Sequence, residues 1–240
     1  MNSDAISIRE KIIKKIQMNH ISTTEIADCL GKTGALEGIV PLNRGHFRVG
    51  NIALVYAYNE RNYELHQQLE SIREGDIVIV ETYNCKNRAI FGDLVSKFLI
   101  LYKRASAIVV NGYMRDAHSL IKENYPVWCK GVTPIGCYNL KNNKKIQKAI
   151  LQGWNRKYLG SIAVCDDTGV VIVPHESINE DFSEKLDFIE LQEDIWYYCV
   201  DTKKWSTYDT VSLKKYLDTQ MLPDEFRKKF EAFIDKQDNK

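Results

Sequence analysis

The stretch FGDLVSKFLILYKRASAIVVNGYMRD, residues 91–116, joins a helix pattern to a strand pattern, with charged residues at both junctions. Gly92 allows a sharp turn after the strand-like segment RAIF, and Asp93 follows at or near the N-cap of the predicted helix, where backbone N–H groups lack partners. The predicted strand AIVV leads to Arg115 and Asp116. The sequence therefore predicts two charged loops beside neighbouring elements of an α/β fold.

These two loops can form one site. Free N–H groups of Leu94 and Val95 at the helix start would bind a carboxylate or phosphate. If the flanking strands are parallel, their C-terminal loops meet at one sheet edge. There Arg115 could bind a carboxylate through two hydrogen bonds, and Asp116 could bind a hard divalent cation. The residues alone leave an alternative open, because Asp often caps helices and Arg–Asp pairs are common on surfaces.

Strand and helix patterns alternate on both sides of this stretch. FRVGNIALVYAY predicts a strand, NYELHQQLESI a helix, EGDIVIVET a turn and a strand, PVWCKG a short strand, and IAVCDDTGVVIVP a hairpin. We predict an N-terminal helix over residues 1–19 and a mixed α/β domain over residues 20–176, with helices covering a sheet.

The whole chain has an ordinary composition. It holds 240 residues, 44% of them hydrophobic and 27% charged, with a net charge of +1, so nothing demands a polyanionic partner. No apolar run has the length of a signal peptide or membrane span, and six scattered cysteines without a CxxC pair indicate reduced thiols. We expect a cytoplasmic protein without a membrane partner.

Residues 177–240 differ in character from the rest. The segment is acidic, then aromatic, and ends in the amphipathic pattern LPDEFRKKFEAFIDKQ with Pro at its start. Exposed aromatic clusters promote aggregation, so we expect Trp196, Tyr197, Tyr198 and Trp205 to pack on the body or on a neighbouring subunit. We interpret the segment as a helical and aromatic extension rather than an independent domain.

Five blocks, in order, resemble the RraA-like family. They are ISTTEIADCLGKTGALEGIVPLNRG, ELHQQLESIREGDIVIVE, AIFGDLV with AIVVNGYMRD, PVWCKGVTPIG, and CDDTGVVIVP. The family includes 4-hydroxy-4-methyl-2-oxoglutarate/4-carboxy-4-hydroxy-2-oxoadipate aldolases and the regulator of ribonuclease activity A. The resemblance implies a three-layer β/β/α domain with mixed sheets, assembled as a homotrimer or homohexamer with active sites between subunits.

The resemblance also implies roles for the motif residues. Gly92 and the amides of Leu94 and Val95 would cradle a pyruvyl group. Arg115 would bind the carboxylate and keto oxygen of the substrate and stabilise the enolate.

The metal ligands follow from the same resemblance. Asp116 would hold Mg²⁺ or Mn²⁺ directly, while Asp93 would hold it through water and shuttle a proton. Glu190 or Glu193 of a neighbouring subunit would complete the site.

The chemistry is coherent with a metal-dependent lyase acting on a 2-keto acid. Retro-aldol cleavage and oxaloacetate decarboxylation both leave pyruvate enolate, whose charge calls for a Lewis acid and a cation. No lysine is placed to argue for a Schiff base. Two alternatives stay open: a non-catalytic regulator that binds a ribonuclease or helicase, and an enzyme for another keto acid or a sugar-like substrate. A methyltransferase is not favoured, because the sequence has no Gly-rich strand-loop-helix that would bind S-adenosylmethionine.

Two departures from the aldolase pattern put the substrate in question. Twenty-one residues separate Asp93 from Arg115, against twenty in the aldolase motif, and we expect the surplus in the loop LYKRAS. Leu159-Gly160-Ser161 stands where the family usually shows Pro-Gly-Asp.

Several other polar residues are candidates for the site. His66 lies on a predicted helix that can approach the site, or serves merely as a surface histidine, and we expect His118 to face solvent. Asp166 and Asp167 fit turn chemistry better than catalysis. The basic run over residues 139–158 lacks a nucleic-acid motif, which favours a solvated face over an RNA-binding one.

Overall fold

The computed structural model describes residues 7–238, with side chains to residue 234. The chain divides into two compact units, one ending at Asn179 and one starting at Glu180. The predicted N-terminal helix is present from Ile8 to Asn19, while residues 1–6 of that prediction lie outside the described part.

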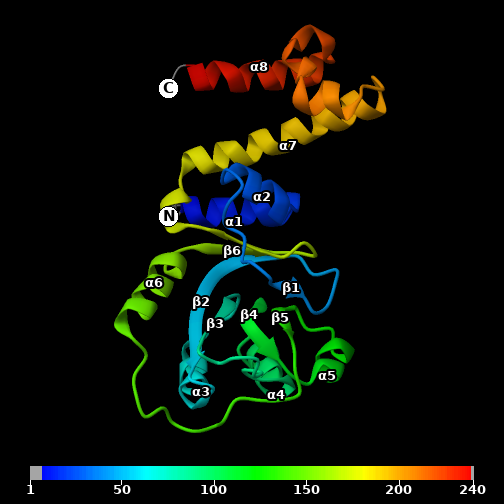
Figure 1. The fold of residues 1–240 in the computed structure, drawn as a ribbon. Helices are drawn as coiled ribbons and strands as arrows, with labels where there is room; N and C mark the ends of the chain where they lie inside the picture. The colour runs from blue at the N-terminus through cyan, green and yellow to red at the C-terminus, as the bar shows by residue number, and fades with distance from the viewer. Residues whose placement is uncertain (1–6, 239–240) are drawn as a thin grey trace, which may run out of the picture. The chain divides into compact units, whose positions relative to one another are not determined.

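The first unit alternates helices and strands as the sequence predicts (Figure 1). Its helices are α1 (Ile8–Asn19), α2 (Thr23–Cys29), α3 (Tyr63–Gln68), α4 (Asp93–Lys97), α5 (Ala117–Lys122) and α6 (Lys148–Tyr158), with a π-helical turn over Phe98–Tyr102. Its strands are β1 (Val40–Pro41), β2 (Arg48–Tyr58), β3 (Ile77–Tyr83), β4 (Ala107–Met114), β5 (Val127–Val132), β6 (Ile162–Cys165) and β7 (Val170–Val173). Short 3₁₀ turns cover Leu69–Ser71 and His175–Ser177.

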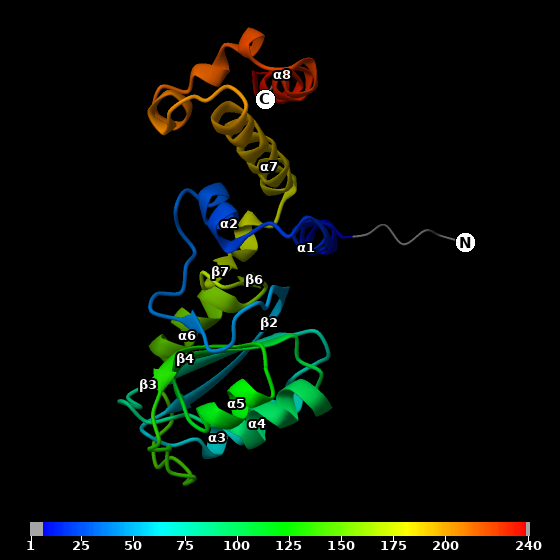
Figure 2. The same cartoon turned by 90° about the vertical axis from the view of Figure 1, so that its right-hand side faces the viewer.

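The strands follow the order β1-β5-β4-β3-β2-β6-β7. Strands β2, β3, β4 and β5 run parallel, while β1, β6 and β7 join antiparallel. The long strand β2 pairs with β6 over Arg48–Asn51 and with β3 over Ile52–Tyr58, so it belongs to two sheets. Figure 2 shows α3, α4 and α5 on one side of the parallel strands and β6 and β7 on the other. This is the expected three-layer β/β/α arrangement.

Two hydrophobic clusters hold the layers together, one on each face of the parallel sheet. Along β3, Val78 and Val80 belong to the cluster beneath the helices, whereas Ile77 and Ile79 belong to the cluster shared with β6 and β7. All four side chains are fully buried. Alternate residues of a strand face opposite sides, so burial on both faces explains the continuous apolar run that the sequence shows here.

The second unit consists of α7 (Glu180–Asp201) and α8 (Asp224–Asp238), joined by a π turn at Tyr208–Ser212 and 3₁₀ turns at Lys215–Leu217 and Thr219–Met221. It has its own core of Ile195, Cys199, Tyr216, Leu222 and Phe230. Three of the predicted aromatic residues, Trp196, Tyr198 and Trp205, pack against this core, and Tyr197 is exposed. Docking on the body or on a neighbouring subunit stays a prediction.

Within the described part of the chain, no helix combines the length and apolar character that crossing a bilayer requires.

Candidate active site

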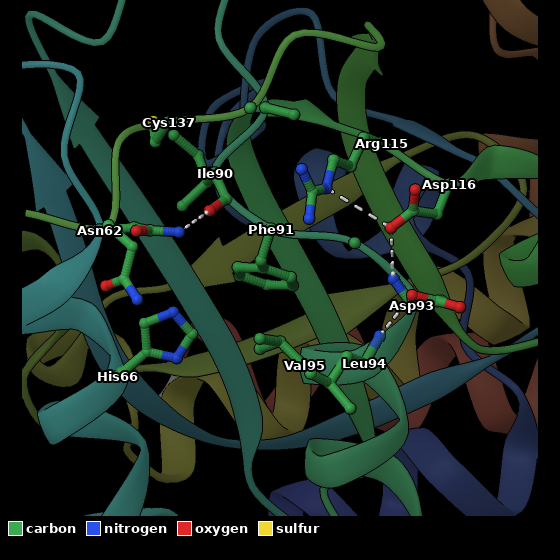
Figure 3. Close-up of a pocket in the computed structure, with 14 residues that line it drawn as sticks. Asn62, His66, Ile90, Phe91, Asp93, Leu94, Val95, Arg115, Asp116 and Cys137 are labelled. Atoms are coloured by element: carbon green, nitrogen blue, oxygen red, sulfur yellow. Dashed lines mark hydrogen bonds and ion pairs between the residues drawn. The ribbon is translucent and has the colours of Figure 1, made fainter.

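The carboxyl ends of β3 and β4 form the edge at which the predicted site residues meet. Pairing between the two strands ends at Val80 and Val110, and β4 then carries an irregularity between Val110 and Tyr113. Beyond it, β4 pairs with the extended segment 89–91: Ile90 N donates to Tyr113 O at 2.8 Å, and Arg115 N donates to Phe91 O at 3.1 Å. These bonds bring the Gly-Asp and Arg-Asp loops side by side (Figure 3).

Gly92 is required by this close approach. A Cβ atom at this position would lie 1.9 Å from Asp116 Oδ2 and 2.9 Å from Arg115 Cγ. The backbone of Gly92 is not left-handed, so it is space rather than conformation that excludes a side chain. Glycine thus lets the Asp116 carboxylate reach the start of α4.

The carboxylate of Asp116 has few hydrogen-bond partners. Its Oδ2 accepts from Asp93 N at 3.3 Å and lies 3.5 Å from Arg115 Nε. Its side chain is 37% exposed, so lone pairs stay open to a ligand. Its backbone is left-handed, at φ 58°, a conformation that costs energy in a residue other than glycine.

The start of α4 differs from the prediction in one respect. Gly92 is the N-cap and Asp93 the first helical residue, and Asp93 Oδ1 accepts from Leu94 N at 2.7 Å. The Leu94 amide was expected to be free for a ligand, whereas here it donates to the neighbouring carboxylate, and its role in ligand binding stays a prediction. Val95 is buried and lines the cavity described below.

The segment between the two loops contains a turn that can hold a surplus residue. The helix that begins at Asp93 widens into a π turn over Phe98–Tyr102, and a π turn holds one residue more than an α turn. The π turn can hold the surplus residue, and it overlaps the stretch LYKRAS at Leu101 and Tyr102, so the place expected for the surplus stays a prediction. Asp93, at the opposite end, still contacts Asp116.

A cavity of about 360 Å³ opens at this edge. The Arg115 guanidinium points toward it in Figure 3, with Asn62 and His66 on the far side of Phe91. Gly136 backs the guanidinium, since a Cβ there would lie 2.9 Å from Arg115 Nη1. A cation thus stands at one end of the cavity and two uncharged polar groups at the other.

Asn62 is a lining residue that the sequence analysis missed. Its Nδ2 donates to Ile90 O at 2.8 Å, which fixes the orientation of the amide. Its Oδ1 is buried and has no hydrogen-bond partner within the described structure. A signal existed, because Asn62 precedes His66 by four residues at a helix start, but the pattern alone names no ligand.

Two titratable groups near Asn62 stay uncharged at neutral pH. Burial lowers the pKa of His66, which lies in α3. The neighbouring thiol of Cys85 and burial together raise the pKa of Cys137, which favours the uncharged thiol at neutral pH. The prediction for His118 is consistent with its exposed position outside the cavity lining.

Asp166 and Asp167 do not join the site. Asp166 binds the backbone of its own turn, through Thr168 N at 2.7 Å, and Thr23 N of α2 at 2.7 Å. Asp167 Oδ1 accepts from Gly45 N at 2.8 Å. Asp166 thus combines the predicted turn bonds with a link to α2, and the bond of Asp167 joins the hairpin to a distant loop.

The donor set at the edge fits a magnesium-type site. No three His, Cys, Asp or Glu side chains gather into a metal cluster among the residues described, so Asp116 and Asp93 stand alone. Mg²⁺ is commonly bound through one or two carboxylates, with water and substrate oxygens as its other ligands. Glu190 and Glu193 lie in α7, and their part in a neighbouring subunit's site stays a prediction.

Comparison with known proteins shows which family the chain resembles. The family model RraA-like, described as Aldolase/RraA, matches residues 23–172. Protein DlpA of Legionella pneumophila is 25% identical over 68% of this chain, but the match covers only 28% of DlpA. A protein of Halalkalibacterium halodurans named "Putative 4-hydroxy-4-methyl-2-oxoglutarate aldolase" is 29% identical over 66% of this chain and 75% of its own length.

Solved structures share the fold. An uncharacterized protein from Pseudomonas syringae has a TM-score of 0.65 at 19% identity, with 89% of this chain and 97% of that one covered. RraAS2 of Streptomyces coelicolor, described as an unusual member of the RNase ES inhibitor RraA protein family, has a TM-score of 0.59 at 21% identity, with 76% and 94% covered.

Proposed function

The chain belongs to the RraA-like family, and on this premise we propose that it is a divalent-metal-dependent lyase that cleaves a 2-keto acid through a pyruvate enolate. The observation that carries the proposal is the pair formed by Arg115 and Asp116. A guanidinium directed at a cavity stands beside a carboxylate whose lone pairs are largely free. An enolate needs a cation and a Lewis acid at neighbouring oxygens, and this pair can supply both.

Each residue of the edge then has a task. Arg115 binds the carboxylate and keto oxygen of the substrate and keeps its charge as the enolate forms. Asp116, with Asp93 beside it, would hold Mg²⁺ or Mn²⁺, which supplies a Lewis acid for the enolate oxygen. The second carboxylate oxygen of Asp93, which does not cap Leu94, accepts the proton of the substrate hydroxyl.

The bond changes balance without a further reactant. Loss of the hydroxyl proton turns the carbinol carbon into a carbonyl as the adjacent carbon–carbon bond breaks. The bonding electrons move into the keto acid and form the enolate, which takes up a proton to give pyruvate. Oxaloacetate decarboxylation passes through the same enolate, with CO₂ as the other product.

The far end of the cavity favours a substrate with a hydroxyl group. Asn62 Oδ1 is a buried acceptor without a partner in the described residues, and such an acceptor gains most from a hydroxyl donor. A groove of about 400 Å³, lined in part by Tyr63, Gln67 and Glu70, continues from His66. This leaves room for a longer or sugar-like keto acid as the natural substrate.

The test is pyruvate release from oxaloacetate and from 4-hydroxy-4-methyl-2-oxoglutarate, with Mg²⁺, Mn²⁺ or a chelator. We expect metal-dependent turnover in which Arg115→Ala lowers kcat/KM about 10³-fold, because the developing enolate loses its cation. Arg115→Lys keeps the positive charge but cannot make two parallel hydrogen bonds, so its kcat/KM should lie between those of the wild type and Arg115→Ala. Arg156→Ala, on the exposed surface of α6, is the matched control and should leave activity unchanged.

Two results would overturn the proposal for these substrates. One is turnover no higher than with the metal alone in folded protein, which would favour the non-catalytic regulator or another keto acid. The other is full activity in Arg115→Ala.

A further inference from the structure

The irregularity in β4 is the feature that joins the two halves of the site. Up to Val110 the strand pairs with β3, and from Tyr113 onward it pairs with segment 89–91 and with Gly131 of β5. Residues Asn111 and Gly112 lie between these two registers. Bulges of this kind bend a strand and re-aim the side chains that follow.

Side chains of β3 hold this irregularity where the backbone ladder stops. Thr82 Oγ1 donates to Asn111 O at 2.7 Å, and Asn111 Nδ2 donates to Glu81 Oε2 at 2.8 Å. A Cβ atom at Gly112 would lie 2.8 Å from Thr82 Cγ2, so glycine permits the approach. Asn111 is thus fixed through both its main chain and its side chain.

Glu81 is an unusual residue for the middle of a sheet. It is only 4% exposed, and its carboxylate accepts hydrogen bonds from two neutral donors, Asn111 Nδ2 and the hydroxyl of Tyr158 in α6. A buried carboxylate is costly unless its hydrogen bonds are well made, and a hydrophobic residue would fill the position at lower cost. Stability therefore gives no reason for a carboxylate here, whereas fixing Asn111 does.

We propose that Glu81 is a positioning residue for the active site, which by fixing Asn111 in the bulge of β4 sets Arg115 and Asp116 against Gly92 and Asp93. The inference rests on the proposed function for its consequence in catalysis, but its structural step does not. Three residues lie between Asn111 and Arg115 in the sequence, and this backbone is tied to segment 89–91 by the bonds at Ile90 and Arg115.

Exchange of the two partners tests the proposal. Glu81→Gln can still accept from Tyr158, and the Asn111 amide can turn its oxygen toward the new NH₂ group, so this is the mild variant of the pair. Asn111→Asp opposes two carboxyl groups. The double variant restores one donor and one acceptor, because Gln at position 81 can donate to Asp at position 111, with the net charge unchanged.

The first readout is amide hydrogen exchange in the folded protein, followed by NMR. Exchange at Ile90 and Arg115 should rise about tenfold in Asn111→Asp and return close to wild type in the double variant, with Glu81→Gln alone close to wild type. Amides of β6 and β7 should not change. Val164→Ala, a cavity variant in the other sheet, is the control for a general loss of stability and should not single out these two amides.

The second readout is the kinetics of pyruvate release. Asn111→Asp should lower kcat about tenfold, since a misplaced guanidinium stabilises the enolate less, and the double variant should recover most of it. No recovery of exchange protection in the double variant would overturn the proposal. Recovered protection without activity in any protein, wild type included, would instead count against the proposed function alone.

Discussion

Two aspartates of the first unit stand in turns at strand ends, and their carboxylates are used in opposite ways. Asp166 at the β6–β7 hairpin accepts from four donors: Thr23 N, Thr23 Oγ1, Thr168 N and Gly169 N. Asp116 at the end of β4 accepts from one amide at 3.3 Å and lies 3.5 Å from a guanidinium nitrogen. The first carboxylate is saturated by its own fold, and the second has capacity left.

The difference teaches how a structural acid can be told from a functional one. Asp166 ties the start of α2 to the hairpin, so its bonds contribute to stability. Asp116 accepts few bonds from the fold, so its carboxylate stays open to the ligand that we propose. Four substitutions can break or sharpen this contrast.

The largest effect should come from Asp116→Asn. The amide keeps the shape but loses the charge that a divalent cation requires, so kcat/KM for pyruvate release should fall about 10³-fold. The unfolding midpoint in urea should hardly change, because Asp116 contributes few bonds to the fold. Calorimetric titration with Mn²⁺ should show weakened binding, and unaltered Mn²⁺ affinity would contradict the role given to this carboxylate.

Gly92→Ala should have the next largest effect. The new methyl group would overlap Asp116 Oδ2 at 1.9 Å, so the carboxylate must move away from the start of α4. Displacement of a reacting group by about 1 Å costs on the order of 10²-fold in rate. Gly153→Ala in α6 is the matched control, since a Cβ there meets nothing within 4 Å and Ala favours a helix. Equal activity in both variants would show that the close approach at Gly92 is unimportant.

Asp166→Asn should give the reverse outcome of Asp116→Asn. An Asn side chain must turn its NH₂ group toward backbone N–H donors, and leaving such partners unsatisfied costs about 1–3 kcal/mol. We expect that loss in the free energy of unfolding, measured in urea, with kcat/KM within about twofold of wild type. A stable variant without activity would mean that the two acids have been assigned the wrong way round.

The sequence predicted the fold where its physical cause is local. The buried run IVIV of β3 and the Asp-Asp-Thr-Gly hairpin were identified correctly because strand burial and turn residues leave short-range patterns. The division of β2 between two sheets left no such pattern, since it depends on the partners β3 and β6. The core of the second unit was missed for the same reason, because its aromatic residues pack on one another across α7 and α8.

The candidate site was predictable to a similar depth. Gly92, Asp93, Arg115 and Asp116 stand in recognisable loops, and the parallel strands bring them together as expected. Glu81 could not be found, because it acts through a side chain on another strand. The hydrogen bond from Leu94 N to Asp93 was not predicted. A carboxylate at a helix start can accept from the same amide that a ligand would use, and the sequence does not say which of the two binds it.

The smallest effect concerns His66, which sharpens the functional side of the contrast. Burial lowers its pKa below the ordinary value of 6.5, so the ring is neutral at pH 7 and gains a proton only in more acidic solution. In that window the unfolded chain binds more protons than the folded one, so stability falls as the pH drops.

Activity should also fall as the pH drops. A charged ring would repel a cation bound at Asp116 and could no longer accept a hydrogen bond from the substrate, so kcat/KM should decline a few-fold below pH 6.5. His66→Gln should flatten this acid limb while leaving the rate near pH 8 within about threefold of wild type. His118→Gln, at an exposed histidine outside the cavity lining, should keep the limb. If both variants keep it, another group titrates there and His66 is only part of the wall.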